Sequence, residues 1–338
     1  MVFTIEYVWI GGNNELRSKT KIIEGPVKSV DDLPNWNYDG SSTGQAQGSD
    51  SEVIIKPRAL FENPFQRRNG FLVLCDTYQP SGAPLKNNHR HWAKRIFDEK
   101  LDEEPWFGLE QEYYLMTPNT NYPLGFQQFE EQTQGQYYCS VGAENAFGRE
   151  IAERHMNYCI EAGIKISGIN AEVGIGQWEY QIGPCVGIEM GDHLWMARYI
   201  MQRVAEDYNV AVNIDPKPLE GEWNGSGCHA NYSTKNMREG SNGIQGIQFI
   251  EKAITKLEST HAEHMKVYGD DNNKRMTGKH ETADFHNFTS GIADRSASVR
   301  IGNETYLNCQ GYFEDRRPGS NCDPYLVSGY LFKTTCLD

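Results

Sequence analysis

The segment FGLEQEYYL, residues 107–115, constrains the fold of this 338-residue chain more than any other stretch. It is rich in strand-forming apolar and aromatic residues, yet it carries Glu110 and Glu112 two positions apart. Successive side chains of a strand point to opposite faces, so both carboxylates share one face, with Cα atoms about 6.5–7 Å apart. That face is either solvated or part of a core or cleft. In a cleft, the two carboxylates stay ionised only beside a compensating charge.

Composition limits the partners and the compartment that the chain allows. Hydrophobic residues make up 38% of it, enough for a sizeable core in one large domain or, more in keeping with its length, two. The net charge of −14 argues against nucleic acid or an anionic membrane as the main partner. The chain shows neither an apolar run long enough to span a bilayer nor a signal-peptide pattern at its start. Eight cysteines without a CxxC pair indicate reduced thiols, and we expect a cytoplasmic protein.

The first part of the chain, residues 1–85, predicts a small β domain with long loops. Strand-like segments at 3–10, 52–57 and 70–78 are separated by turn-forming sequences such as GGNNE and PSGAP. The loop 36–52, WNYDGSSTGQAQGSDSE, has little apolar content and is either a flexible excursion or a functional loop.

The remaining residues, 86–338, mix helices with short strands. Helical spacing predicts helices within 88–100, 148–163, 190–208 and 243–265. Strands are expected within 107–115, 166–173, 176–183, 224–233 and 298–302. We therefore predict an α+β protein whose second domain has a large, mostly antiparallel sheet flanked by helices.

Carboxylates and one imidazole recur on the apolar strand-like segments. They are Glu110, Glu112, Glu172, Glu179, His229 and Glu314. Each residue taken alone is more often an edge carboxylate or a satisfied core histidine. Together, oxygen-rich ligands with a single imidazole suit Mg²⁺ or Mn²⁺ better than structural zinc. Six ligands divide into two cations with three protein ligands each, an arrangement that recurs in phosphoryl transfer.

Arginines gather in turn-like sequence in the last third of the chain. They are Arg275, Arg295, Arg300, Arg316 and Arg317. Arginine recognises carboxylate and phosphate groups in bidentate fashion, although a solvated basic surface is the common alternative for any one of them. The chain has no GxxxxGK[ST] element, which excludes a P-loop.

Several of these segments, in this order, resemble the glutamine synthetase family of the eukaryotic type over nearly the whole chain. They are WNYDGSSTGQAQGSDSE, FGLEQEYYL, GINAEVGIGQWEYQIGP, NGSGCHANYS, RMTGKHET, DRSASVRIG and FEDRRPGSNCDPY. The resemblance implies a β-grasp domain over 1–85 and a catalytic domain over 86–338. It also implies a decamer of two stacked pentameric rings, with active sites between neighbouring subunits. One departure is the sequence IGNETYLNC after Arg300, where Ile-Pro-Arg is expected.

The resemblance implies ligation of ammonia to the γ-carboxylate of glutamate through γ-glutamyl phosphate, with ATP as co-substrate and two or more Mg²⁺ or Mn²⁺ ions. By the same resemblance, Glu110, His229 and Glu314 hold one ion, and Glu112, Glu172 and Glu179 hold the other. The implied catalytic residues are Asp39, Ser42, Glu281 and Arg295; the ATP contacts are Arg295, Arg300, Asn231, Ser233 and Tyr312; the glutamate contacts are Asn224, Gly225, His229, Arg275 and Arg316.

Two other functions remain open at this stage. A ligase that joins glutamate to a polyamine or another amine would keep the metal ligands and change the ammonium pocket, but Asp39 and Ser42 stand in the expected NYDGSS loop. A non-catalytic ring protein would lose metal ligands, Glu281 or Asp39, and all of them are present.

Overall fold

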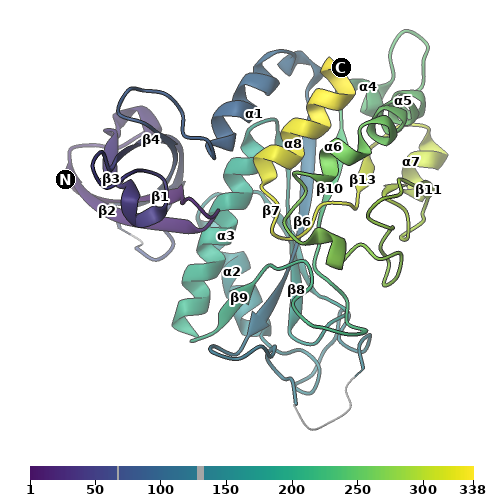
Figure 1. Cartoon of the computed structure of the whole chain (residues 1–338), viewed down its shortest axis with the longest axis horizontal. Helices are drawn as coiled ribbons and strands as arrows, with labels where there is room; N and C mark the ends of the chain where they lie inside the picture. The colour runs from purple at the N-terminus through teal and green to yellow at the C-terminus, as the bar shows by residue number, and fades with distance from the viewer. Residues whose placement is uncertain (67, 128–132) are drawn as a thin grey trace.

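A computed structural model describes residues 1–66, 68–127 and 133–338, and its strands form two sheets (Figure 1). The first sheet has the order β2-β1-β5-β4-β3. Its strands are β1 (Val2–Ile10), β2 (Leu16–Glu24), β3 (Trp36–Asp39), β4 (Glu52–Glu62) and β5 (Gly70–Tyr78). Strands β1 and β5 pair in parallel and the other pairs are antiparallel. The strands predicted at 3–10, 52–57 and 70–78 are confirmed.

Two strands of the first sheet were not predicted from the sequence. Strand β2 lies at the sheet edge, and its exposed residues alternate with half-buried ones that are mostly polar, so it lacks the apolar pattern of a core strand. Strand β3 is the start of the 36–52 loop, and it pairs with β4 from Trp36 to Asp39. That loop is therefore partly ordered by the sheet.

The second sheet contains the segments with the acidic residues. Its order is β11-β12-β13-β10-β6-β8-β7, and β9 also pairs with β6. The strands are β6 (Trp106–Met116), β7 (Ile166–Ala171), β8 (Gln177–Val186), β9 (Ala211–Asn213), β10 (Cys228–Ser233), β11 (Ser290–Ile292), β12 (Val299–Ile301) and β13 (Phe313–Asp315). Among the described strands of this second sheet, only β11 and β12 pair in parallel, so the mostly antiparallel sheet and the α+β class are confirmed.

Helices flank the second sheet (Figure 1). They are α1 (His89–Asp98), α2 (Arg149–Glu161), α3 (Glu189–Asp207), α4 (Lys235–Glu239), α5 (Gly246–Ser259), α6 (His261–Met265), α7 (Asn303–Asn308) and α8 (Pro324–Phe332). The single helix expected within 243–265 is wrong in one respect, because non-helical backbone at Thr260 separates α5 from α6. Helix α8 was not predicted, since it is apolar on all sides and shows no amphipathic period.

The pleat of β6 separates the packed core from the site. Gln111 and Tyr113 face α3, where Trp195 and Arg198 lie against them. Glu110 and Glu112 point to the other side of the sheet. Helix α3 packs against both α2 and α8 around this core. In the described ranges, none of the helices has both the length and the apolar character needed to cross a bilayer.

Candidate active site

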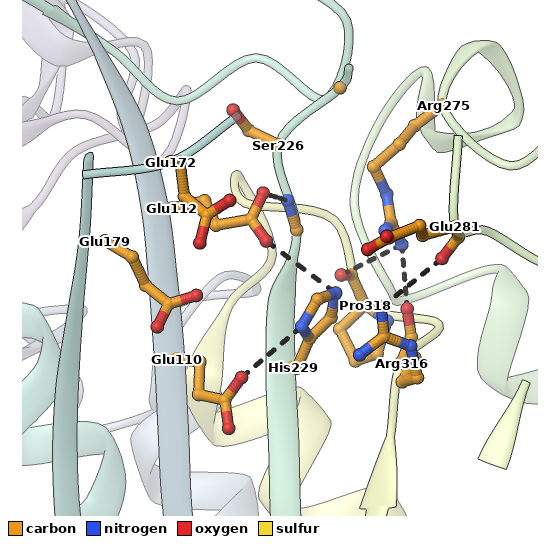
Figure 2. Close-up of polar contacts among 12 residues, drawn as sticks. Glu110, Glu112, Glu172, Glu179, Ser226, His229, Arg275, Glu281, Arg316 and Pro318 are labelled. Atoms are coloured by element: carbon orange, nitrogen blue, oxygen red, sulfur yellow. Dashed lines mark hydrogen bonds and ion pairs between the residues drawn. The ribbon is translucent and has the colours of Figure 1, made fainter. Parts of the chain in front are cut away.

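A cavity of about 340 Å³ opens on the face of the second sheet that carries Glu110 and Glu112. Its lining contains the residues Glu110, Glu112, Glu172, Glu179, Asn224, Gly225, His229, Arg275, Glu281, Arg295 and Arg316. Figure 2 shows the four labelled glutamates of β6, β8 and the end of β7 on one side of His229, with Arg275, Glu281 and Arg316 on the other. The cavity is thus acidic at one end and basic at the other.

Three neighbouring strands bring Glu110, His229 and Glu314 together. Strand β10 lies between β6 and β13, with His229 opposite Glu110 and Asn231 opposite Glu314. One ligand atom of each of the three residues lies within 4.8 Å of the others. Nδ1 of His229 is 3.5 Å from a carboxylate oxygen of Glu110 and 3.6 Å from one of Glu314.

The other three predicted ligands lie beside this group. Glu112 and Glu179 face each other across β6 and β8. Glu172 follows the last residue of β7, so its predicted position on a strand is wrong by one residue. The Gly227 N–H donates to Glu112 over 2.8 Å and the Val173 N–H donates to Glu172 over 3.1 Å.

Burial and mutual repulsion raise the pKa values of this second group. Burial, with the charge of Glu172, raises the pKa of Glu112 to about 8. Burial and the three neighbouring glutamates raise the pKa of Glu179 to about 9. The pKa of Glu172 rises to about 7, again chiefly through burial. The positive charge near these carboxylates, such as that of Arg275 and Arg316 beside Glu112, is therefore too small to offset their burial and mutual repulsion.

The first group has partial compensation. Burial alone would raise the pKa of Glu110, but hydrogen bonding to His229 and Asn231 and the charge of Arg316 outweigh it and hold that pKa below its usual range. Arg300 and Arg316 donate to the two oxygens of Glu314 over 3.0 and 2.6 Å. Burial and the charge of Arg316 lower the pKa of His229, which keeps its imidazole neutral and able to act as a ligand.

The donor set fits hard divalent cations. Five carboxylates and one neutral imidazole offer mainly oxygen ligands, which Mg²⁺ and Mn²⁺ prefer. The raised pKa values of Glu112 and Glu179 indicate that their negative charges are not fully compensated, and bound cations would compensate them.

The basic end of the cavity is held by backbone carbonyl groups. Arg275 is 5% exposed, and its guanidinium donates to the carbonyl oxygens of Arg316, Arg317 and Pro318 over 2.7–3.1 Å. Burial, more than the opposing charge of Glu112, sets its pKa, which falls to about 10. Next to it, Gly225 has no room for a side chain, because an added Cβ would collide with the Pro216 carbonyl and with Arg275.

The segment with Glu281 closes over this end. Arg316 donates to the Glu281 carbonyl over 3.3 Å and to the Arg295 carbonyl over 3.1 Å. His280 and Glu281 have φ values of 53° and 59°, which is unusual for two consecutive non-glycine residues. The neighbouring contacts therefore hold a costly backbone conformation in place.

A second cavity of about 520 Å³ adjoins the first one, and Glu110 and Gln181 line both. The lining of this second cavity includes three of the ATP contacts that the resemblance implies, Asn231, Ser233 and Tyr312. Arg238, which the sequence did not indicate, donates to the Ser233 hydroxyl over 3.0 Å and lies over the Trp106 ring. Arg300 lines neither cavity among the described residues and pairs with Glu314 instead.

Asp39 and Ser42 lie elsewhere in the chain. Asp39 is the last residue of β3 and Ser42 lies in the 3-10 turn that follows it, and neither is among the described residues that line the first cavity. The exposed Asp39 carboxylate accepts hydrogen bonds from the Ser41 and Ser42 hydroxyls over 2.6 and 2.8 Å. These bonds, with the Ser41 N–H, lower its pKa to about 2.

Gln181 is a site residue that the sequence could have indicated. It follows Glu179 by two positions on β8, so strand alternation places both on one face. Its side chain donates to the Asn170 amide over 2.8 Å and also bonds to Glu179. Tyr138 and Asn170 also line the cavity, but neither stands in a pattern that marks it.

Comparisons with known proteins agree with this geometry. Residues 86–335 match the model of the glutamine synthetase catalytic domain. The chain is 53% identical over 336 residues to the chloroplastic glutamine synthetase of Brassica napus, covering 98% of this chain and 78% of that protein. It is also 53% identical to a cytosolic isozyme from Pinus sylvestris, with 98% and 93% covered. A cryo-electron microscopy structure of Plasmodium falciparum glutamine synthetase shares the fold, with a TM-score of 0.77 and 16% identity over 98% of this chain and 71% of that one.

The fold and the site define an ATP-dependent ligase, and the matches show that the chain belongs to the glutamine synthetase family. It makes glutamine from glutamate and ammonia, using ATP and divalent metal ions. Its substrates are small molecules, and it forms oligomers as the family does. The two other functions left open by the sequence, a ligase for another amine and a non-catalytic ring, are thereby set aside.

Proposed function

We propose that the first cavity is the catalytic centre and that its carboxylates bind two or more Mg²⁺ or Mn²⁺ ions. The grouping of Glu110, His229 and Glu314 within 4.8 Å is the observation that carries this proposal. Glu112, Glu172 and Glu179 would hold a second ion, which would satisfy their raised pKa values. When bound, such ions neutralise phosphate charge during transfer.

Glutamate would bind at the basic end of the first cavity and ATP in the adjoining one. Arg275 and Arg316 would meet the carboxylates of glutamate, close to Asn224, Gly225 and His229. Asn231, Ser233 and Tyr312 would contact the nucleotide, and Glu110 and Gln181 mark where the two cavities meet. An oxygen of the γ-carboxylate then attacks the terminal phosphorus of ATP at that junction, and ADP leaves.

The resulting γ-glutamyl phosphate has a good leaving group. Arg295, which lines the cavity, would stabilise the charge on the transferring phosphate. Arg300, which donates a hydrogen bond to Glu314, would add positive charge next to that carboxylate. Ammonia attacks the acyl carbon and phosphate leaves, while Glu281 covers the basic end and excludes water.

Ammonium would be bound and deprotonated by Asp39 of a neighbouring subunit. Asp39 is ionised, exposed and held by Ser42, but it is separate from the cavity of its own chain. A carboxylate attracts the ammonium cation and then accepts its proton. A ring that places the first sheet of one chain against the cavity of the next would complete the site, and we propose a decamer of two pentameric rings.

We also propose a domain boundary and a cellular compartment for this chain. We place the boundary near residue 85, between a β-grasp domain of 1–85 and a catalytic domain of 86–338, because the first sheet ends at Tyr78 and the catalytic-domain match starts at 86. All eight cysteines are free in the structure, which supports a cytoplasmic protein, although the relatives include both cytosolic and chloroplastic isozymes.

Mixed oligomers test the shared site. Asp39→Ala leaves the cavity intact, and Glu179→Gln leaves Asp39 intact, so each variant alone should be nearly inactive. After the two are dissociated, mixed and reassembled, about one quarter of sites would pair an intact cavity with an intact Asp39, if a site lies between two chains. Glutamine formation should therefore return to about that fraction. A mixture that stays as inactive as its components would contradict the proposal that Asp39 acts across subunits.

A further inference from the structure

Asn224, which lines the basic end of the cavity, is held on three sides. Its backbone N–H donates to Oε1 of Gln134 over 2.6 Å. Nε2 of Gln134 donates back to Oδ1 of Asn224 over 2.7 Å. The Asn224 carbonyl accepts a hydrogen bond from the Tyr114 hydroxyl over 3.0 Å. Gln134, a loop residue with no role in the reaction described above, thus makes two hydrogen bonds to Asn224, which lines the substrate cavity.

The pattern of donors fixes how both amides are turned. The backbone N–H of Asn224 can only donate, so the Gln134 atom facing it must be the oxygen. The Gln134 nitrogen therefore faces Asn224, and the side-chain atom that meets it there must be Oδ1.

A second contact supports the same orientation of Gln134. Its Nε2 also lies 3.5 Å from Nδ1 of His280, and Nε2 of His280 lies 3.1 Å from the Glu222 carboxylate. With its Nε2–H directed to Glu222, the imidazole offers Nδ1 as an acceptor for Gln134. Gln134 thus connects the Asn224 loop to the segment that carries Glu281.

We propose that Gln134 is a positioning residue that turns the Asn224 amide so that its NH₂ group faces the bound glutamate. Nδ2 of Asn224 donates to none of the residues in the described parts of the chain, while Oδ1 is already engaged. A carboxylate of glutamate accepts hydrogen bonds, so it is stabilised by this NH₂ group and would be repelled by the amide oxygen. The inference rests on the proposed placement of glutamate beside Asn224.

Gln134→Glu is the sharpest test, because it keeps the shape and removes the donor. The new carboxylate still accepts from the backbone N–H, but it cannot donate to Oδ1, so the Asn224 amide turns its oxygen toward the cavity. The KM for glutamate should rise about tenfold to hundredfold, the range for a lost hydrogen bond to a charged group. The KM for ATP and the binding of Mn²⁺ should stay as in the wild type. Gln136→Glu adds the same charge at an exposed position two residues away and serves as the matched control.

Gln134→Ala separates orientation from simple support. This substitution leaves the Asn224 amide free to turn either way. Gln134→Ala should therefore raise the KM for glutamate less than Gln134→Glu does. A merely structural role predicts the reverse order, because alanine removes the whole contact. An effect of Gln134→Ala that equals or exceeds that of Gln134→Glu would overturn the proposal.

Asn224→Ala distinguishes a wrong substrate placement from a wrong role for Gln134. If Asn224→Ala leaves the KM for glutamate unchanged, glutamate does not bind where we place it. If that variant raises the KM and Gln134→Glu does not, the placement stands and the role of Gln134 is wrong. In the double variant, Gln134→Glu should add little to Asn224→Ala, because both act on the same hydrogen bond.

Discussion

The two faces of the second sheet shift the pKa values of their buried carboxylates in opposite directions. On the cavity face, Glu112 and Glu179 are 9% and 7% exposed and have pKa values raised to about 8 and about 9. On the opposite face, which we call the core face, Asp315 is fully buried, yet its pKa lies below the usual range. Glu314 and Asp315 are adjacent in β13 and belong to one face each.

The difference lies in the partners. Asp315 receives two hydrogen bonds of 2.8 Å from the Arg317 guanidinium and one of 2.9 Å from the Tyr268 hydroxyl, so the charge of the pair is balanced within the chain. The cavity face gathers glutamates without enough cations. Burial of unbalanced charge is expensive, and a fold keeps it only where a ligand supplies the opposite sign. The comparison therefore supports the proposal that the cavity face binds the metal ions, while the core face is balanced within the chain.

Breaking the pair on the core face should have the largest effect on stability. Asp315→Asn leaves the Arg317 guanidinium buried without a counter-charge, and we expect a loss of about 3–5 kcal/mol in the free energy of unfolding. Chemical denaturation of the metal-free protein measures it. Glu179→Gln, a substitution of the same type on the cavity face, should leave stability unchanged or raise it. If both variants lose stability equally, the two faces do not differ as described.

Removing one charge from the cavity face should instead abolish activity. Glu112→Gln keeps the shape of the side chain but weakens metal binding, and glutamine formation should fall about 100-fold or more. Coupled measurement of phosphate and glutamine under saturating substrates provides the test. A variant that keeps more than half of the wild-type rate would show that Glu112 holds no essential ion. Asp98→Asn, on the exposed surface of α1, should keep the full rate.

The pH dependence of stability should also separate the faces. Glu172, Glu112 and Glu179 have folded pKa values near 7, 8 and 9, well above the ordinary value of 4.5, so the folded state binds more protons than the unfolded state between these limits. These three groups therefore stabilise the metal-free protein fully below about pH 4.5, and the free energy of unfolding falls as the pH rises toward 9.

Added Mg²⁺ should cancel this fall, because cations favour the ionised carboxylates. Metal at 100 times its dissociation constant should raise the free energy of unfolding by about 2.7 kcal/mol per site. At one fixed metal concentration, the gain should be larger at pH 8 than at pH 6, because protons compete less with the metal at pH 8. Thermal or chemical unfolding at both pH values measures it. A gain that is equal at the two pH values would separate metal binding from these carboxylates.

The smallest effect is expected for exposed pairs outside both faces. Lys94 and Asp98 pair one helical turn apart on α1, with side chains about half exposed. Lys94→Ala should change the free energy of unfolding by no more than about 0.5 kcal/mol and leave turnover unaffected. A larger change would show that surface ion pairs matter more to this fold than the comparison allows.

The fold was predictable from the sequence where the spacing of apolar and polar residues matches the faces that are buried in the structure. The strand period of 107–115 places Gln111 toward Arg198 and its two glutamate neighbours toward the cavity, and β6 has this arrangement. Edge strand β2 escaped prediction because its pairing with β1, and not an apolar pattern, defines it. Helix α8 escaped because it is apolar on all sides. The break at Thr260 likewise depends on where α5 and α6 pack.

Prediction of the site was limited by contacts between loops. Arg238 and Gln134 come from segments without periodic pattern, and their importance follows from partners distant in the chain, Glu104 and Asn224. The residues alone predicted Glu110, His229 and Glu314 only as a set of ligand types, since strand order decides which of them touch. Their grouping around one ion was implied by the family resemblance. The role that we propose for Asp39 requires a second subunit, so a single chain does not display it.

Equilibrium dialysis with Mn²⁺ tests the central claim most directly. At neutral pH the wild-type protein should retain two or more Mn²⁺ ions per chain. Glu110→Gln and Glu179→Gln should each lose one of the tight sites, while Asp98→Asn binds as the wild type does. If both cavity variants retain the wild-type number of ions at the wild-type affinity, the acidic face of the second sheet is not the metal centre.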